Sequence, residues 1–335
     1  MNTIPAMLSL MLPLAATERL LVDTDCGFLG DDGTTLVMLL RSPERVRVDG
    51  ITIVSGNVWA SRGAVYTGEI LRLLKSSRAP VYLGAEMPLL HTPAMAEQAH
   101  LKWGPVEFRG AFAEKPPPAS TKQAGGAIEY VIRSIEARPG QLTVVALGPM
   151  TNLAIALRLR PAIAAKIRRL AFMGGNYRVP GNASREAEFN FWFDPEAAQA
   201  VLRSAIPEKI MFGLDVCNKA MLDKAGFEQI VAARTPISER FREDFGVRYP
   251  GFVKNPEAKV SLWDSLVSAW LINPGLFSAP ERLYLDVDTR FGPTYGKVIP
   301  LDRKLAPQAT PVEMMNDLDF PRVFALFRDL LMRRQ

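Results

Sequence analysis

The sequence is poor in the side chains that most often bind transition metals or transfer protons near neutral pH. It has two cysteines, Cys26 and Cys217, and two histidines, His91 and His100. The cysteines show no paired spacing of thiolate ligands, so neither a zinc site nor a disulfide framework is indicated. Because histidine is the usual general acid or base, its scarcity limits the candidates for proton transfer.

Long apolar runs and blocks of like charge are also lacking. Beyond the first 18 residues, no run of about 18 uncharged apolar residues occurs that could span a bilayer. The net charge is +5, from 40 basic and 35 acidic residues, and the basic residues are scattered. Scattered charge is typical of a solvated surface, so we expect no membrane and no nucleic-acid partner.

The first 18 residues, MNTIPAMLSLMLPLAATE, are apolar and end in small residues. They resemble the apolar stretch of a signal peptide, but no lysine or arginine precedes that stretch. Two interpretations stay open: a surface extension of a cytoplasmic protein, which we expect, or a signal that directs export to the periplasm.

The rest of the chain alternates short apolar runs with longer segments of helical spacing. Strands are predicted at RLLVDTD, VRVDGITIVSG, APVYLG, QLTVVALG, IRRLAFMGG and EKIMFGLDV. Helices are predicted between them at residues 33–42, 62–77, 125–139, 150–166 and 194–205. This alternation predicts an α/β fold with a mostly parallel twisted sheet and helices on both faces, a Rossmann-like core.

Two segments interrupt the alternation. Residues 85–122 are predicted to form a long, lid-like loop with both histidines facing solvent. Residues 246–262, GVRYPGFVKNPEAKVSL, read as a second irregular stretch before an apolar helix at WDSLVSAWLI. The C-terminal DFPRVFALFRDLLMRR is predicted to be a surface helix.

The densest chemical signal lies in Leu20–Leu40, LLVDTDCGFLGDDGTTLVMLL, where four aspartates separate two apolar runs. Carboxylates packed this closely repel one another unless a cation or a shared proton offsets the repulsion. Charge-dense oxygen ligands suit Ca²⁺ or Mg²⁺. A competing interpretation is a phosphatase-type DxD pair in which one aspartate attacks a phosphoryl group, although no phosphate-binding lysine loop lies nearby.

The stretch DTDCGFLGDDGTTLVMLL resembles the N-terminal signature of the nucleoside hydrolases, the inosine-uridine-preferring N-ribohydrolases. Further matches follow in the family's order: ITIVSGN, ALGPMTNLAIAL, LAFMGGN, GNASREAEFNFWFDPEAA, MFGLDV and LWDSLVSAW. The resemblance implies one large domain over residues 19–335. It also implies Ca²⁺-dependent cleavage of the N-glycosidic bond of ribonucleosides, giving free base and ribose.

The resemblance also assigns roles. It implies that Asp25 is the general base and a metal neighbour, and that Asp23 holds the loop. The further Ca²⁺ ligands would be Asp32, Asp264 and the backbone carbonyl of Leu147. Ribose and pocket contacts would come from Asp31, Asn57, Asn182, Glu188 and Asn190.

The match departs from the family in three places. Two extra residues separate Gly27 from Asp31. Cys26 replaces the usual proline, and we interpret this cysteine as a small buried filler. Trp263 stands where many relatives carry a histidine that protonates the leaving base. In relatives with tryptophan there, stacking activates purines, so we expect a purine preference, with Trp103 as the opposite face of the stack. Core packing is the other interpretation of Trp263.

A nucleoside- or sugar-binding protein with weak or no turnover remains the alternative, because the proton donor is missing and the aspartate loop is altered. Relatives form homodimers or homotetramers, and the sequence does not choose between the two.

Overall fold

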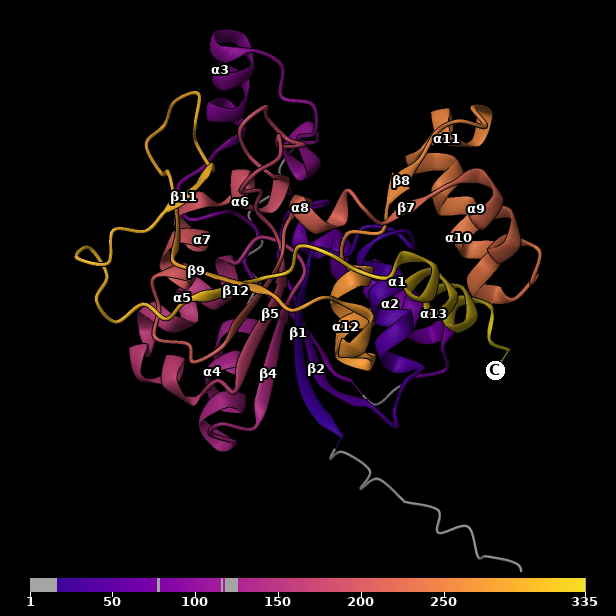
Figure 1. Cartoon of the computed structure of the whole chain (residues 1–335), viewed down its shortest axis with the longest axis horizontal. Coiled ribbons are helices and arrows are strands. Elements are labelled where there is room, and N and C mark those ends of the chain that lie inside the picture. Colours follow the sequence, from indigo (N-terminus) through magenta and orange to yellow (C-terminus); the bar gives the residue numbers. More distant parts are fainter. Residues whose placement is uncertain (1–16, 77–78, 116, 118–125, 335) are drawn as a thin grey trace, which may run out of the picture.

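The computed structural model describes residues 17–76, 79–115, 117 and 126–334. An eight-stranded sheet runs through the molecule, with helices on both of its faces (Figure 1). All neighbouring strands pair in parallel except the last pair, which is antiparallel. In spatial order the strands are β3 (Val81–Leu83), β2 (Val46–Ile53), β1 (Glu18–Thr24), β4 (Leu142–Ala146), β5 (Arg169–Met173), β6 (Lys209–Phe212), β12 (Val312–Met314) and β9 (Glu281–Leu283).

Successive side chains of the central strands enter two different cores. Leu20 and Val22 of β1 belong to one apolar cluster, whereas Leu21 belongs to the other. Alternation with a period of two therefore buries both faces of the sheet, which is why these strands read as continuous apolar runs. The first face is covered by α1 (Asp32–Leu40), α2 (Ala60–Leu73), α12 (Ser265–Ile272) and α13 (Phe320–Met332), and the second by α4 (Ala127–Ala137), α5 (Thr151–Leu159) and α7 (Pro195–Leu202). The predicted single α/β domain is confirmed.

The strand order places a crevice at the centre of the sheet. The chain proceeds outward from β1 to β2 and β3, then returns to the other side of β1 with β4, β5 and β6. At such a reversal the loops after neighbouring strands diverge and leave space at the carboxyl ends. The aspartate loop follows β1 and the sequence LGPMTN follows β4, so both lie at this point.

The predicted long loop at 85–122 is partly wrong. It contains the helix α3 (Pro93–Trp103) and the short 3₁₀ helix η1 (Gly110–Ala113). The signal was present in the sequence: the Thr92 hydroxyl accepts a hydrogen bond from the Met95 amide at 3.2 Å, and proline occupies the first helical position.

The prediction that His91 faces solvent is also wrong. His91 is 1% exposed and packs edge-on against Trp192, with ring centroids 4.7 Å apart. Burial lowers the pKa of His91 to about 4, so the ring is neutral near pH 7. His100 is half-buried, and its Nδ1 accepts a hydrogen bond from the Val106 amide at 3.1 Å.

Two other boundaries differ from expectation. The helix predicted over 150–166 ends at Leu159, and a 3₁₀ helix, η2 (Pro161–Lys166), follows. Pro161 has no backbone N–H and so cannot continue the α-helical hydrogen bonding. The segment predicted to be irregular at 246–262 instead contains the end of α10 (Pro236–Arg248), α11 (Pro250–Lys254) and β8 (Val260–Ser261).

The remaining elements complete the rim and the far edge. They are α6 (Phe189–Phe193), α8 (Leu214–Cys217), β7 (Met221–Leu222), α9 (Lys224–Val231), η3 (Pro274–Leu276), β10 (Leu285–Val287) and β11 (Val298–Pro300). In the part of the chain that the structure describes, no helix combines the length and apolar character needed to cross a membrane. The predicted extension or signal at 1–18 lies almost entirely outside the described residues.

Candidate active site

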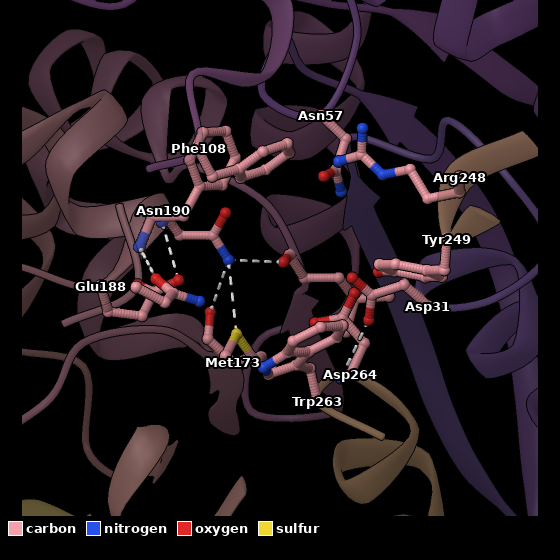
Figure 2. Close-up of a pocket in the computed structure, with 13 residues that line it drawn as sticks. Asp31, Asn57, Phe108, Met173, Glu188, Asn190, Arg248, Tyr249, Trp263 and Asp264 are labelled. Atoms are coloured by element: carbon pink, nitrogen blue, oxygen red, sulfur yellow. Dashed lines mark hydrogen bonds between the residues drawn. The ribbon is translucent and has the colours of Figure 1, made fainter. Parts of the chain in front are cut away.

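A cavity of about 330 Å³ opens at the carboxyl ends of the central strands (Figure 2). Its walls come from segments that are distant in sequence, including the aspartate loop, the loop after β4, α6 and the start of α12. The lining residues are Asp31, Asn57, Phe108, Leu147, Met173, Asn182, Glu188, Phe189, Asn190, Arg248, Tyr249, Trp263 and Asp264.

Asp25 is completely buried and is not a lining residue of this cavity, but it is hydrogen-bonded to Asn57, which is. Its Oδ2 accepts a hydrogen bond from the Asn57 amide at 2.6 Å. Its Oδ1 is buried and has no hydrogen-bond partner among the described residues. A buried carboxylate oxygen without a partner is costly, so this atom points to a ligand or a proton.

Two motif glycines pack directly against the Asp25 carboxylate, where a larger residue would not fit. A Cβ on Gly56, in SGN, would lie 2.0 Å from the Asp25 Oδ2 atom. A Cβ on Gly148, in LGPMTN, would lie 2.7 Å from the Asp25 Cγ atom. Both motifs therefore leave space for the Asp25 carboxylate, although they are distant from it in the sequence.

Three further carboxylates converge beside Asp25. Ligand atoms of Asp31, Asp32 and Asp264 all lie within 4.8 Å of one another, although Asp264 is more than 230 residues downstream. The Asp264 amide lies 3.4 Å from the Asp31 Oδ1 atom. A hydrogen bond of 2.8 Å between the hydroxyls of Thr34 and Ser265 joins the first turns of α1 and α12. Packing of these two helices therefore brings the two ends of the chain to one site.

Asp32 occupies the first position of α1 and is fully buried. It accepts hydrogen bonds from the Thr24 hydroxyl and, at 3.1 Å, from the Asn57 side-chain amide. Carboxylates are favoured at a helix start, where free amides and the helix dipole attract negative charge. That role accounts for one aspartate and leaves the others unexplained.

The pKa values of the cluster are raised. Burial, followed by the charge of Asp32, raises the pKa of Asp31 to about 7. Burial and the neighbouring carboxylates also raise the pKa of Asp25 and of Asp264 well above the usual range. Raised values mean that the cluster lacks positive charge, and its donor set of oxygens alone fits a hard divalent cation.

The opposite wall is built around α6. Glu188 caps this helix, and its carboxylate accepts hydrogen bonds from the amides of Gly175 at 2.7 Å, Asn190 at 2.8 Å and Phe191 at 3.2 Å. The Asn190 side chain donates to the Leu147 carbonyl oxygen at 2.8 Å. This bond links the expected ribose contact to the expected metal ligand.

The other predicted positions are occupied as follows. Asn182 lines the cavity, and its side-chain oxygen accepts a hydrogen bond from the Phe189 amide at 2.8 Å. Asp23 accepts hydrogen bonds from Thr52 at 2.5 Å and from Asn152 at 2.7 Å, which fixes the end of β1. Cys26 is fully buried, as expected of a filler.

The two tryptophans expected to sandwich a base are not together. Trp263 lines the cavity, but Trp103 does not. Trp103 instead packs edge-on against Phe291, with ring centroids 5.0 Å apart. The helix α3, which the sequence interpretation missed, carries Trp103 to this other position.

Several cavity residues were missed from the sequence, above all Arg248 and Tyr249. They lie where α10 ends, and Pro250 follows immediately. Proline disfavours helical geometry in the preceding residue, and Tyr249 has φ −126° and ψ 61°. The dipeptide Tyr-Pro was a usable signal for a break, but nothing local shows that the break faces the cavity.

Comparisons with known proteins agree on the family. The model of the inosine-uridine preferring nucleoside hydrolase family matches residues 20–325. The pyrimidine-specific ribonucleoside hydrolase RihA of Salmonella agona is 35% identical over 287 residues, 84% of this chain and 87% of that protein. RihB of Escherichia coli, also named pyrimidine-specific, is 31% identical over 283 residues with the same coverage.

Solved structures show the same fold. A plant nucleoside hydrolase, PpNRh1, aligns with a TM-score of 0.77 at 21% identity over 95% of this chain and 99% of that chain. A purine-preferring ribonucleoside hydrolase from Gardnerella vaginalis aligns with a TM-score of 0.72 at 24% identity over 94% and 98%. This chain belongs to the inosine-uridine preferring nucleoside hydrolase family and is an N-glycosyl hydrolase.

Proposed function

We propose that the enzyme hydrolyses ribonucleosides to free base and ribose with Ca²⁺ at the aspartate cluster, and that it prefers purines. The observation that carries the proposal is the convergence of Asp31, Asp32 and Asp264 within 4.8 Å beside the unpartnered Oδ1 of Asp25. Four carboxylates packed together, of which Asp31 and Asp264 line the cavity, are too costly to serve as structure alone.

The cation would be held by Asp25, Asp32, Asp264 and the carbonyl oxygen of Leu147. When bound, Ca²⁺ supplies positive charge that activates water and orients hydroxyl oxygens. The oxygen-only donors favour Ca²⁺ over softer metals. The Leu147 oxygen already accepts one hydrogen bond, from Asn190, and a carbonyl oxygen has a second lone pair for a ligand.

Asp25 would act as the general base. The Asn57 amide fixes one of its oxygens at 2.6 Å, which leaves the other free to accept the proton of an attacking water. A single displacement at C1′ on this geometry inverts its configuration.

Side chains on both walls would orient the ribose. Asp31 on one wall and Asn182, Glu188 and Asn190 on the other are suited to hold hydroxyl groups. Glu188 uses three hydrogen bonds to backbone amides, and a carboxylate can accept about four. Holding the sugar rigidly beneath the base lowers the entropic part of the barrier.

The purine preference rests on the aromatic wall. Trp263 and Tyr249 line the cavity, and none of its described lining residues is a histidine. A stacked indole can raise the basicity of a purine ring, whereas a pyrimidine offers less stacking area. The curated relatives named pyrimidine-specific support the opposite preference.

A panel of nucleosides, scored for ribose release with and without a chelator, tests this function. We expect chelator-sensitive release, faster from inosine, guanosine or adenosine than from uridine or cytidine. Faster release from the pyrimidines would overturn the preference but not the activity. Binding of a nucleoside by calorimetry without any sugar release would instead support the alternative of a binding protein.

The stacking role of Trp263 has its own test. Trp263→Ala should lower turnover of inosine about 10²-fold while affecting 4-nitrophenyl riboside much less, because that leaving group needs no activation. Similar losses on both substrates would argue for a packing role. Trp270→Phe, in the same buried helix but outside the cavity lining, controls for general damage to α12.

The location and assembly of the enzyme remain predictions. We propose a cytoplasmic homodimer or homotetramer, with export as the alternative if residues 1–18 are a signal. N-terminal sequencing of the mature protein and light scattering of the eluted peak decide these two points.

A further inference from the structure

We propose that Arg248 stabilises the departing nucleobase and so takes the place of an acidic histidine. This inference rests on the proposed function and names a further catalytic residue within it.

The position of Arg248 follows from the end of α10. The helix stops at Arg248 because the next residue, Tyr249, directly precedes Pro250, and this end of the helix borders the cavity. The guanidinium lies 4.4 Å from the ring centroid of Phe108 and 5.4 Å from that of Phe28. Two aromatic faces therefore hold the charged group, and one donor is shared with the Tyr249 side chain, so most of its hydrogen-bond donors stay available.

The charge of Arg248 is not neutralised by an ion pair with a described carboxylate. Among the described residues that line the cavity, Arg248 is the one cationic side chain, facing Asp31, Glu188 and Asp264 on the other walls. No ion pair joins it to a carboxylate within the described ranges. By contrast, Arg240 on the same helix pairs with Asp244 at 2.7 Å and with Glu69 at 2.9 Å.

The walls of the cavity leave one place for the base. The groups suited to ribose hydroxyls, Glu188 and Asn190, lie across the cavity from Arg248 and Tyr249 (Figure 2). With the sugar held beside the aspartates, the base must lie against the aromatic side chains. The guanidinium there presents up to five N–H donors to ring nitrogens and carbonyl oxygens.

The chemical step balances with these groups. The bond from C1′ to the base nitrogen breaks, and its electron pair leaves with the base. Water adds to C1′ and gives its proton to Asp25. Arginine stays protonated in proteins, so Arg248 donates hydrogen bonds to the base anion rather than a proton. The base then takes a proton from solvent, and Asp25 returns its own proton to solvent.

The test compares two substrates with two variants. Arg248→Met keeps an apolar stem for packing on Phe108 but removes the donors, and Arg248→Lys keeps the charge. We expect Arg248→Met to lower kcat for inosine by about 10²-fold and turnover of 4-nitrophenyl riboside by less than about 3-fold. Arg248→Lys should recover part of the loss on inosine, while KM changes little.

A matched control lies in a second, adjoining cavity, which Arg62, Phe108 and Arg248 line. Arg62 pairs with Glu114 at 2.7 Å on the surface, outside the nucleoside cavity, so Arg62→Met should leave both substrates unchanged. Across a series of ribosides, the rate of Arg248→Met should also depend more steeply on the pKa of the leaving group than the rate of wild type.

Three results would separate the possibilities. Equal losses on both substrates would overturn the role of Arg248. A substrate-dependent loss in Tyr249→Phe but not in Arg248→Met would overturn it too, by assigning the donor to the phenol. If the wild-type enzyme releases no ribose from any nucleoside but hydrolyses 4-nitrophenyl riboside normally, the proposed natural substrate fails instead, whatever Arg248 does.

Discussion

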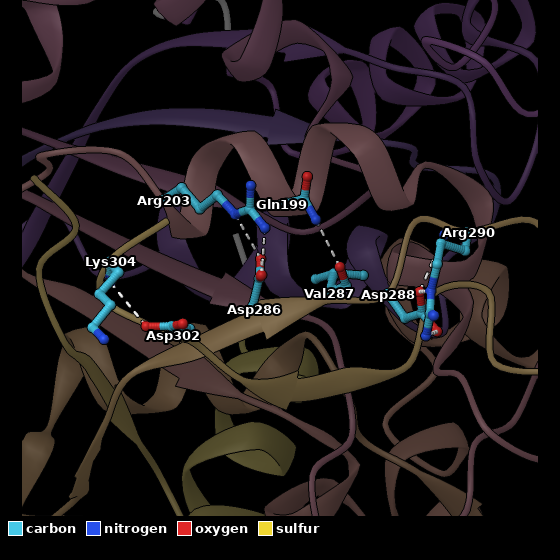
Figure 3. A network of polar contacts seen from close by, with 8 residues as sticks. All are labelled: Gln199, Arg203, Asp286, Val287, Asp288, Arg290, Asp302 and Lys304. Carbon is cyan, nitrogen blue, oxygen red and sulfur yellow. Dashed lines mark hydrogen bonds and ion pairs between the residues drawn. The ribbon is translucent and has the colours of Figure 1, made fainter. Parts of the chain in front are cut away.

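Two groups of carboxylates in this molecule differ in how their negative charge is compensated. At the far edge, Asp286 in the middle of β10 accepts two hydrogen bonds from Arg203, the residue after α7, at 2.9 and 2.6 Å (Figure 3). Asp288 is held in the same way by Arg290 and by the Thr294 hydroxyl. At the cavity, Asp25, Asp31, Asp32 and Asp264 face one another without an arginine paired to any of them among the described residues.

The difference shows in the direction of the pKa shifts. Hydrogen bonds from Arg290 lower the pKa of Asp288, whereas burial and like charges raise the pKa of Asp31 to about 7. The first group is satisfied by the protein itself and stabilises the fold. The second group requires something from outside, which is typical of a functional site.

The largest expected effect comes from removing the proposed base. Asp25→Ala should reduce ribose release by at least about 10³-fold, because both a proton acceptor and a cation ligand are lost. The fold should persist, since the substitution removes buried negative charge. Turnover is measured by reducing-sugar release, with circular dichroism as the control, and activity above a tenth of wild type would contradict the assignment.

Removal of the cation should have a similarly large effect on turnover, and its effect on stability should depend on the cavity cluster alone. Chelation should abolish turnover, and Ca²⁺ at about a hundred times its dissociation constant should restore it and add about 2.7 kcal/mol to the free energy of unfolding. Asp264→Asn should lose most of this stabilisation, whereas Asp286→Asn should retain it. Equal stabilisation of both variants in denaturant titrations would place the cation elsewhere.

Breaking the satisfied group should affect stability without affecting chemistry. Asp286→Asn should lower the free energy of unfolding by about 1–3 kcal/mol, because Arg203 loses a charged acceptor. Its kcat for nucleosides should equal that of wild type. A fall in kcat at unchanged stability would contradict the structural role given to this network.

The smallest effect is a contrast in pH dependence. In chelated protein, the folded state keeps a proton on Asp31 up to about pH 7, which the unfolded state loses near pH 3.8. Stability from this group is therefore full below pH 3.8 and is lost as the pH rises toward 7. Denaturant midpoints should fall over this range in the chelated protein, and added Ca²⁺ should reduce that slope. An unchanged slope would mean that the cation does not contact this cluster.

The order of strands and helices was largely predictable because both faces of the sheet are buried. Apolar runs with period two and amphipathic helical spacing are local properties, and they gave the α/β class and most elements correctly. The segment at 85–122 failed because its helix α3 has one buried residue, Ala96, and so carries little periodic signal. His91 failed for a related reason, since long-range aromatic packing against Trp192 buries it.

The sequence by itself determined the chemistry available: an acidic loop at the end of a strand, glycines that make room, and a distant WDSL motif. These features are local or recognisable by order along the chain. Only the tertiary structure decided which groups meet, because contact between α1 and α12 brings Asp264 to Asp31, and the end of α10 sets Arg248 over Phe108. Such encounters depend on how separate elements pack, and no spacing within one segment encodes them.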